Sequence, residues 1–107
     1  MSLTETLLAP FIRREERRFP TARSCDGALD LLAREYGRQW LLANLRGRDV
    51  VDFGSGLGLQ SVALARDLGC RVTGYEILAR HREHARELAA REGVGEDRVR
   101  FLPPPQE

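Results

Sequence analysis

The chain has 107 residues, of which 42% are hydrophobic and 31% are charged. This length suits a single domain, and this composition excludes a wholly disordered chain, a collagen-like repeat and a disulfide scaffold. Because 17 basic residues balance 16 acidic ones, we expect no general attraction to nucleic acid or to an anionic membrane.

The cysteines and the N-terminus indicate a cellular location. Cys25 and Cys70 are far apart and match no short metal-ligand spacing, which favours reduced thiols in a cytosolic protein. Residues 1–10 lack the basic region and the apolar run of a signal peptide. No apolar stretch approaches the roughly 18 residues of a transmembrane helix. We therefore expect a cytoplasmic protein.

Residues 1–46 are expected to form a helical extension. Ser2 and Glu5 have the spacing of a capping box, which predicts the start of a helix. Pro10 is expected to open a second helical piece, which Pro20 ends. Over 26–45, apolar residues recur at spacings of three and four, which predicts one helix with a core-facing stripe. The stripe comprises Leu29, Leu32, Ala33, Tyr36, Trp40 and either Ala43 or Asn44.

From residue 47 the pattern changes to alternating strands and helices. Val50, Val51 and Phe53 form a short apolar run before a glycine-rich turn, which is typical of a strand buried on both faces. Helical spacing and β-branched runs then predict a helix over 59–68, a strand over 71–76, a helix ending near 92 and a strand over 99–102.

These elements predict an α/β fold. Right-handed crossovers would arrange the βαβαβ unit as a Rossmann-like parallel sheet with the strand order 3-2-1. A doubly wound domain has about six strands, so we expect 47–107 to be a truncated half domain that follows the helical extension 1–46.

A glycine-rich segment, Asp52-Phe53-Gly54-Ser55-Gly56-Leu57-Gly58, lies where the first predicted strand meets a helix. Glycines there let a ligand approach the backbone, and the helix N-terminus offers free amides. Glu76 ends the second strand, 20 residues after Gly56, where nucleoside-binding α/β folds place the acid that binds ribose hydroxyls. A dinucleotide fingerprint would need a small residue at Leu59, so the pattern argues against NAD.

The segment and Gly74-Tyr75-Glu76-Ile77 resemble the first two motifs of class I S-adenosylmethionine-dependent methyltransferases. The resemblance covers about residues 48–102 and implies S-adenosyl-L-methionine as the cofactor. It implies that the loop from Gly54 to Gly58 wraps the methionyl and ribose parts, while Asp52 helps to order this loop. The binding residues it implies are Asp52, Gly54, Ser55, Gly56, Gly58, Glu76 for the ribose diol and Ile77 for the adenine.

The sequence also departs from that family. Residues 103–106 are three prolines and a glutamine, where the family usually has an acid or amide for the adenine amino group. The residues around the methyl-transfer site are expected to follow Glu107, so no catalytic residue is assigned. Two functions stay open: a methyltransferase of unknown acceptor, and a non-catalytic cofactor-binding or interaction module left from a truncated methyltransferase.

Three weaker patterns favour ordinary structural explanations. His81 and His84 lack a third ligand, so solvated surface histidines are expected rather than a metal site. The basic and acidic run 13–18 favours a solvated helix face over an RNA contact. Tyr36 and Trp40 are assigned to the core rather than to a cover over the cofactor.

A truncated sheet predicts an association surface. The strand over 49–53 would have no neighbour on one side, and such an edge favours pairing with another chain. We therefore expect a homo-oligomer, a partner chain, or N-terminal helices that cover the exposed sheet face.

Overall fold

The computed structural model describes residues 24–106, so the helices predicted within 1–23 and the charged run 13–18 lie outside the described residues. The elements are α2 (Ala28–Tyr36), α3 (Arg38–Asn44), β1 (Asp49–Phe53), α4 (Leu59–Leu68), β2 (Arg71–Tyr75), α5 (Ala79–Arg91) and β3 (Val99–Leu102). None of the described helices is long and apolar enough to cross a membrane.

The predicted parallel sheet is confirmed. The strands lie in the order β1-β2-β3, which is the predicted order 3-2-1 counted from the other edge, and both pairings are parallel. The register sets Val50 beside Val72 and Val72 beside Val99, so β-branched residues line one face. The predicted boundary between the extension 1–46 and the half domain 47–107 lies between α3 and β1, and it stays a prediction.

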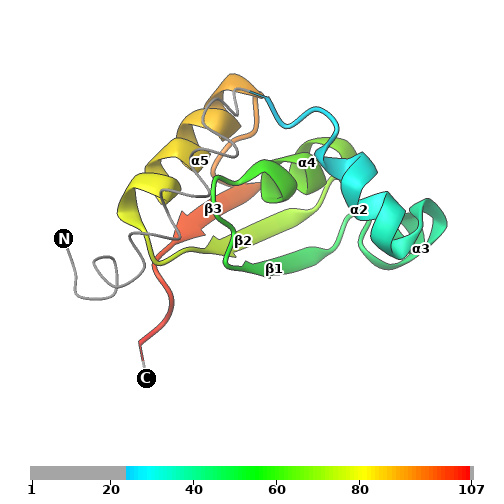
Figure 1. Ribbon diagram of the computed structural model, residues 1–107, viewed down its shortest axis with the longest axis horizontal. Coiled ribbons are helices and arrows are strands. Elements are labelled where there is room, and N and C mark those ends of the chain that lie inside the picture. Colours follow the sequence, from blue (N-terminus) through cyan, green and yellow to red (C-terminus); the bar gives the residue numbers. More distant parts are fainter. Residues whose placement is uncertain (1–23, 107) are drawn as a thin grey trace.

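The core lies between this face and two helices. Helices α4 and α5 run along the same face of the sheet, and α2 packs against α4 (Figure 1). Val62 and Leu88 from the helices and Phe101 from β3 are at most 2% exposed. Cys70 is fully buried, and its thiol donates to the Leu45 carbonyl at 3.0 Å. Burial raises the pKa of this thiol.

The single helix predicted over 26–45 is wrong, because the chain breaks into α2 and α3 at Gly37. This residue has φ 87° and ψ 138°, a conformation that glycine reaches without steric penalty. The break also changes the predicted stripe. Leu29, Leu32 and Ala33 pack against the core, whereas Tyr36 is 52% and Trp40 47% exposed. The two aromatic rings stack on each other, with centroids 5.5 Å apart, instead of entering the core.

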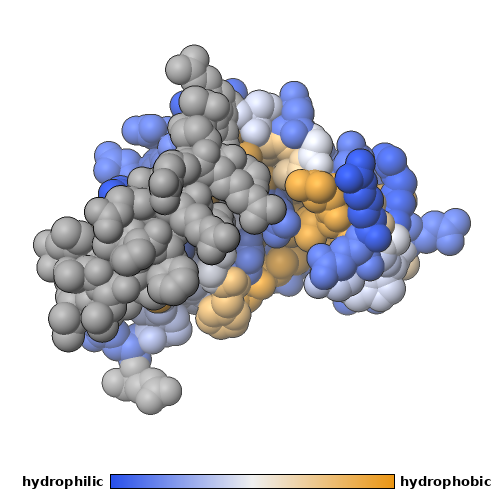
Figure 2. Space-filling model, in the orientation of Figure 1, coloured by the Kyte–Doolittle hydropathy of each residue, from blue (hydrophilic) through white to orange (hydrophobic). Residues whose placement is uncertain are grey.

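The prediction that the first strand is buried on both faces is also wrong. Val51 is 55% and Phe53 72% exposed, because no described helix covers the second face of the sheet. Phe53 stacks on Tyr75 of the neighbouring strand, with ring centroids 5.3 Å apart. Figure 2, which has the orientation of Figure 1, shows hydrophobic surface at the position of β1.

An arginine on α4 joins the start of the described chain to the helices on the sheet. Arg66 contacts Glu92 at 2.6 Å, Asp67 at 2.8 Å and Asp26 at 2.9 Å. The other carboxylate oxygen of Glu92 accepts the Cys25 amide at 3.2 Å. The segment before α2 is therefore tied to the C-terminal end of α5.

Candidate functional site

The glycine loop folds over the carboxyl end of β2. The amides of Gly54 and Ser55 both donate to the Tyr75 carbonyl, at 2.8 and 3.1 Å. Because Glu76 follows Tyr75 directly, these bonds bring the loop and the acid of the next strand to one place. The structure thus assembles two features that the sequence places 20 residues apart.

The three loop glycines serve different purposes, although all have positive φ, 72°, 58° and 85° at Gly54, Gly56 and Gly58. A β-carbon at Gly54 or Gly56 would meet nothing within 4 Å, so these positions border open space. A β-carbon at Gly58 would lie 2.6 Å from Cβ of Ala85 and 3.0 Å from Cζ of Phe101. Gly58 is therefore required for packing between α4 and α5, whatever it contributes to a ligand.

Gly74 on β2 is a fourth glycine that the fold requires here. A β-carbon at this position would lie 2.9 Å from the Ser55 hydroxyl and 2.8 Å from Cδ1 of Phe101. Only glycine leaves room for the loop to lie against the strand. The sequence pattern marked Gly74 as part of a motif but gave it no role.

Asp52 orders the loop through a residue that the sequence reasoning missed. The hydroxyl of Ser61, which is fully buried in the first turn of α4, donates to Oδ2 of Asp52 at 2.6 Å. This bond links the end of β1 to the first turn of α4 and so connects the two sides of the glycine loop. A polar side chain on the same helix face as Ala65 and Leu68 was the signal that could have identified Ser61.

Two buried oxygens at this point have no hydrogen-bond partner in the described part of the chain, the hydroxyl of Ser55 and Oε2 of Glu76. Burial raises the pKa of Glu76 above its usual 4.5, while the charge of His81, the Ile77 amide and Arg82 act in the opposite direction. Buried polar atoms are normally hydrogen-bonded, so this pair indicates a place for a polar ligand.

The neighbourhood of Glu76 has an apolar side and one unexpected residue. Ile77 is 45% exposed beside the acid, so a flat apolar group can pack against it. His81, predicted to lie on the surface, is only 7% exposed because α5 turns it toward the Glu76 end of β2. The described residues contain no group of three side chains suited to a metal ion.

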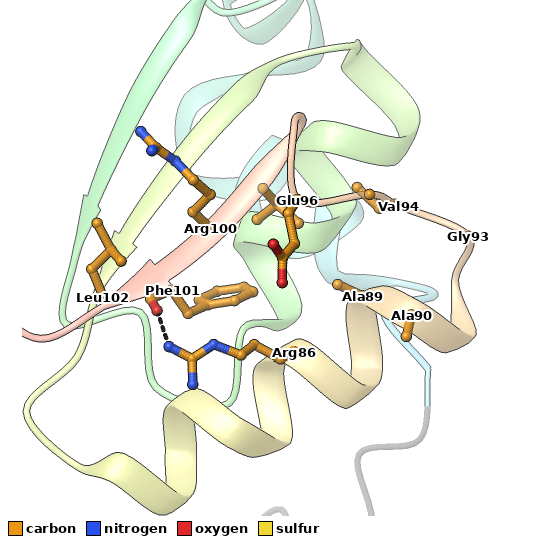
Figure 3. A pocket seen from close by; sticks show the side chains of 11 residues that line it. Arg86, Ala89, Ala90, Gly93, Val94, Glu96, Arg100, Phe101 and Leu102 are labelled. Atoms are coloured by element: carbon orange, nitrogen blue, oxygen red, sulfur yellow. Dashed lines mark hydrogen bonds between the residues drawn. The ribbon is translucent and has the colours of Figure 1, made fainter.

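The predicted site residues therefore gather at the carboxyl ends of β1 and β2, with Gly58 behind them against α5. A separate cavity of about 560 Å³ lies at the outer edge of β3, beside the second half of α5 (Figure 3). None of the predicted site residues lines it. We place the site at the loop because the unpartnered oxygens of Ser55 and Glu76 lie there.

No family model and no curated protein matches the chain. Among solved structures, an RNA methyltransferase from Salinibacter ruber in complex with S-adenosyl-L-homocysteine matches at TM-score 0.58 and 28% identity, over 74% of this chain and 47% of that one.

Two further solved structures are S-adenosylmethionine-dependent methyltransferases, each in complex with S-adenosyl-L-homocysteine. The protein from Thiobacillus denitrificans matches at TM-score 0.58 and 28% identity, and the one from Geobacter sulfurreducens at 0.58 and 29%. Each match covers 77% of this chain and 30% of the other, so the chain spans less than half the length of these proteins. The described part of the chain has the Rossmann-like fold of S-adenosylmethionine-dependent methyltransferases.

Proposed function

We propose that this chain binds S-adenosyl-L-methionine and forms the cofactor-binding part of a methyltransferase. The observation that carries the proposal is the pair of buried, unpartnered oxygens on Ser55 and Glu76 beside an open glycine loop. A ribose diol offers two hydroxyl donors to the carboxylate, and charged acceptors form the stronger hydrogen bonds. The solved structures with bound S-adenosyl-L-homocysteine support the same ligand.

The residues present fit this cofactor part by part. The open space at Gly54 and Gly56 leaves room for the methionyl and ribose groups, and Ile77 offers an apolar surface for the adenine. The N-cap of α4 is Gly58, which supplies no side-chain cap, so the helix's positive end is left for the ligand carboxylate. When bound, the cofactor supplies an electrophilic methyl group on its sulfonium.

The residues of this chain then bind and orient the cofactor, and no catalytic residue is proposed. Positioning of the reactants supplies much of the acceleration in reactions of this kind. The residues that bind and select the methyl acceptor are proposed to lie outside 24–106, since the chain spans 30–47% of the length of the matched methyltransferases.

The test is titration calorimetry with S-adenosyl-L-homocysteine and, separately, with NAD. We expect the first ligand to bind and NAD to give no heat, because Leu59 stands where a dinucleotide site needs a small residue. Binding of NAD in place of S-adenosyl-L-homocysteine would overturn the assignment of the cofactor.

The second candidate function is a non-catalytic cofactor-binding or interaction module. The match covers only 30–47% of the length of the solved methyltransferases, which favours this module for the chain taken alone. Binding of the cofactor without methyl transfer to small-molecule, protein and RNA acceptors would select the module. Transfer of a radioactive methyl group to any of them would select the enzyme.

We also propose that the edge of β1 (Asp49–Phe53) pairs with a second copy or a partner chain. No described strand pairs with its outer side, and Val51 and Phe53 are exposed beside it.

We further propose a cytoplasmic location. Both described cysteines are free thiols, which supports this location.

A further inference from the structure

Arg82, near the start of α5, reaches back to the turn that carries the proposed ribose-binding acid. Its Nη1 donates to the Glu76 carbonyl at 2.6 Å and to the Ile77 carbonyl at 2.9 Å. Both carbonyls belong to the short connection between Tyr75, where β2 ends, and Ala79, where α5 begins. One guanidinium thus holds two consecutive peptide groups.

The connection is held from its other side by the sheet. The Glu76 amide donates to the Leu102 carbonyl of β3 at 3.0 Å, so both ends of this residue's backbone are bonded. With amide and carbonyl fixed, the direction in which the Cα–Cβ bond of Glu76 leaves the backbone is fixed as well. A guanidinium suits this purpose because its planar fork is preorganised and always charged.

Arg82 also affects the charge of the acid. Together with His81, it opposes the effect of burial on the Glu76 carboxyl and so favours the ionised form. The ionised form is the one that accepts hydrogen bonds with both oxygens. Geometry and charge therefore act on the same side chain.

We infer that Arg82 is a positioning residue that holds the Glu76 carboxylate toward the ribose hydroxyls of the cofactor. The inference rests on the proposed function, since it names how this chain orients its cofactor acid. Arg82 itself is not proposed to touch the cofactor. A purely structural role, as an anchor for α5, makes different predictions.

The test is a double-mutant cycle measured by calorimetry with S-adenosyl-L-homocysteine. We expect Arg82→Ala to weaken binding about tenfold, which is the range of one charge-assisted hydrogen bond. Because Arg82 acts through the Glu76 side chain, the double variant with Glu76→Ala should bind no more weakly than Glu76→Ala alone. Losses that simply add would overturn the inference.

A second readout separates positioning from loss of fold. The 2′,3′-dideoxy analogue of S-adenosyl-L-homocysteine lacks the hydroxyls that Glu76 would bind, so wild type and Arg82→Ala should bind it equally. A structural role would weaken both ligands alike. Arg82→Lys, which keeps a charged donor, should recover part of the affinity and serves if the alanine variant does not fold.

Arg86 provides the matched control on the same helix. Its Nη2 donates to the Phe101 carbonyl at 2.5 Å, on β3 rather than on the connection that carries Glu76, and Arg86 lines the outer cavity (Figure 3). Arg86→Ala should therefore keep wild-type affinity for S-adenosyl-L-homocysteine. Equal affinity of Arg82→Ala and wild type would overturn the inference alone, whereas a wild-type chain that binds neither ligand would overturn the proposed function as well.

Discussion

The loop glycines separate binding from packing at the level of single residues. We expect Gly56→Ala to cost about 1–2 kcal/mol of stability, because an alanine at φ 58° is strained but meets open space. Its methyl group would project toward the proposed ligand and weaken S-adenosyl-L-homocysteine binding at least tenfold. Gly58→Ala should cost about 3 kcal/mol or more, because its methyl group overlaps Ala85.

Urea unfolding and calorimetry on both variants check this contrast. A Gly56→Ala chain with unchanged affinity would contradict the position of the ligand. A Gly58→Ala chain of wild-type stability would contradict the packing between α4 and α5.

The buried Glu76 carboxylate, which is proposed to bind the ligand, is expected to lower the stability of the folded chain at neutral pH. Its pKa is raised by burial, so the native state holds this proton more tightly than the unfolded state does. The stability that this tighter proton binding contributes is therefore fully present below pH 4.5, the pKa in the unfolded chain. It is lost as the pH rises through the raised pKa of the native state. We expect Glu76→Gln to be more stable than wild type at pH 7, with the gain vanishing below pH 4.5.

Urea midpoints at pH 7 and pH 4 measure this effect. Glu83→Gln, on the exposed side of α5, is the control and should change neither midpoint. A Glu76→Gln chain that is less stable at pH 7 would show that the carboxylate has partners in the folded chain.

Individual site residues differ in how far the sequence predicted them. Asp52, Gly56 and Glu76 were predicted because their spacing along a strand and a turn is a local pattern. Ser61 and Arg82 were missed because a serine or an arginine within a helix resembles a surface residue until its tertiary contact is known.

Between elements, the contacts of Glu92 tie α5 to α4 and to the start of the described chain. Hydrogen bonds from Arg66 lower the pKa of Glu92 below its usual 4.5. A lowered native pKa contributes stability that is present above pH 4.5 and lost as the pH falls through the native value. We expect Glu92→Gln to cost about 1–2 kcal/mol at pH 7 and much less in acid.

Thermal or urea unfolding across this pH range checks the expectation. Glu87→Gln, at an exposed position of the same helix, is the matched control and should have little effect. An equal loss from Glu92→Gln at pH 7 and at acid pH would contradict an ionic role.

The elements themselves were predictable because hydrophobic periods of two and 3.6 residues are local signals. The break at Gly37 was not, because helical spacing continues through it and the backbone conformation depends on how α2 and α3 pack. The burial of β1 on one face only was missed for a related reason. An apolar run indicates a buried strand but does not show which elements cover it.

For the whole molecule, the open edge and face of β1 predict association. We expect size-exclusion chromatography with light scattering to show species larger than a monomer at micromolar concentration. Val51→Lys, which puts a charge on the exposed face, should shift the chain toward the monomer. Leu31→Lys is the control, because Leu31 is similarly exposed, at 57%, but lies on α2.

A wild-type chain that stays monomeric at high concentration, with no binding of a dye for apolar surface, would contradict the association. The sequence predicted this surface through the number of strands, yet it gave no information on what pairs with it. That choice depends on surface complementarity, which periodicity does not encode.

The central claim is that the glycine loop and Glu76 form one binding site for S-adenosyl-L-methionine. Titration of S-adenosyl-L-homocysteine into wild type and Glu76→Ala tests it most directly. We predict saturable binding to wild type and about 10- to 100-fold weaker binding to the variant, as expected for lost hydrogen bonds to a charged acceptor. Equal affinities, or no binding to either chain, would contradict the claim.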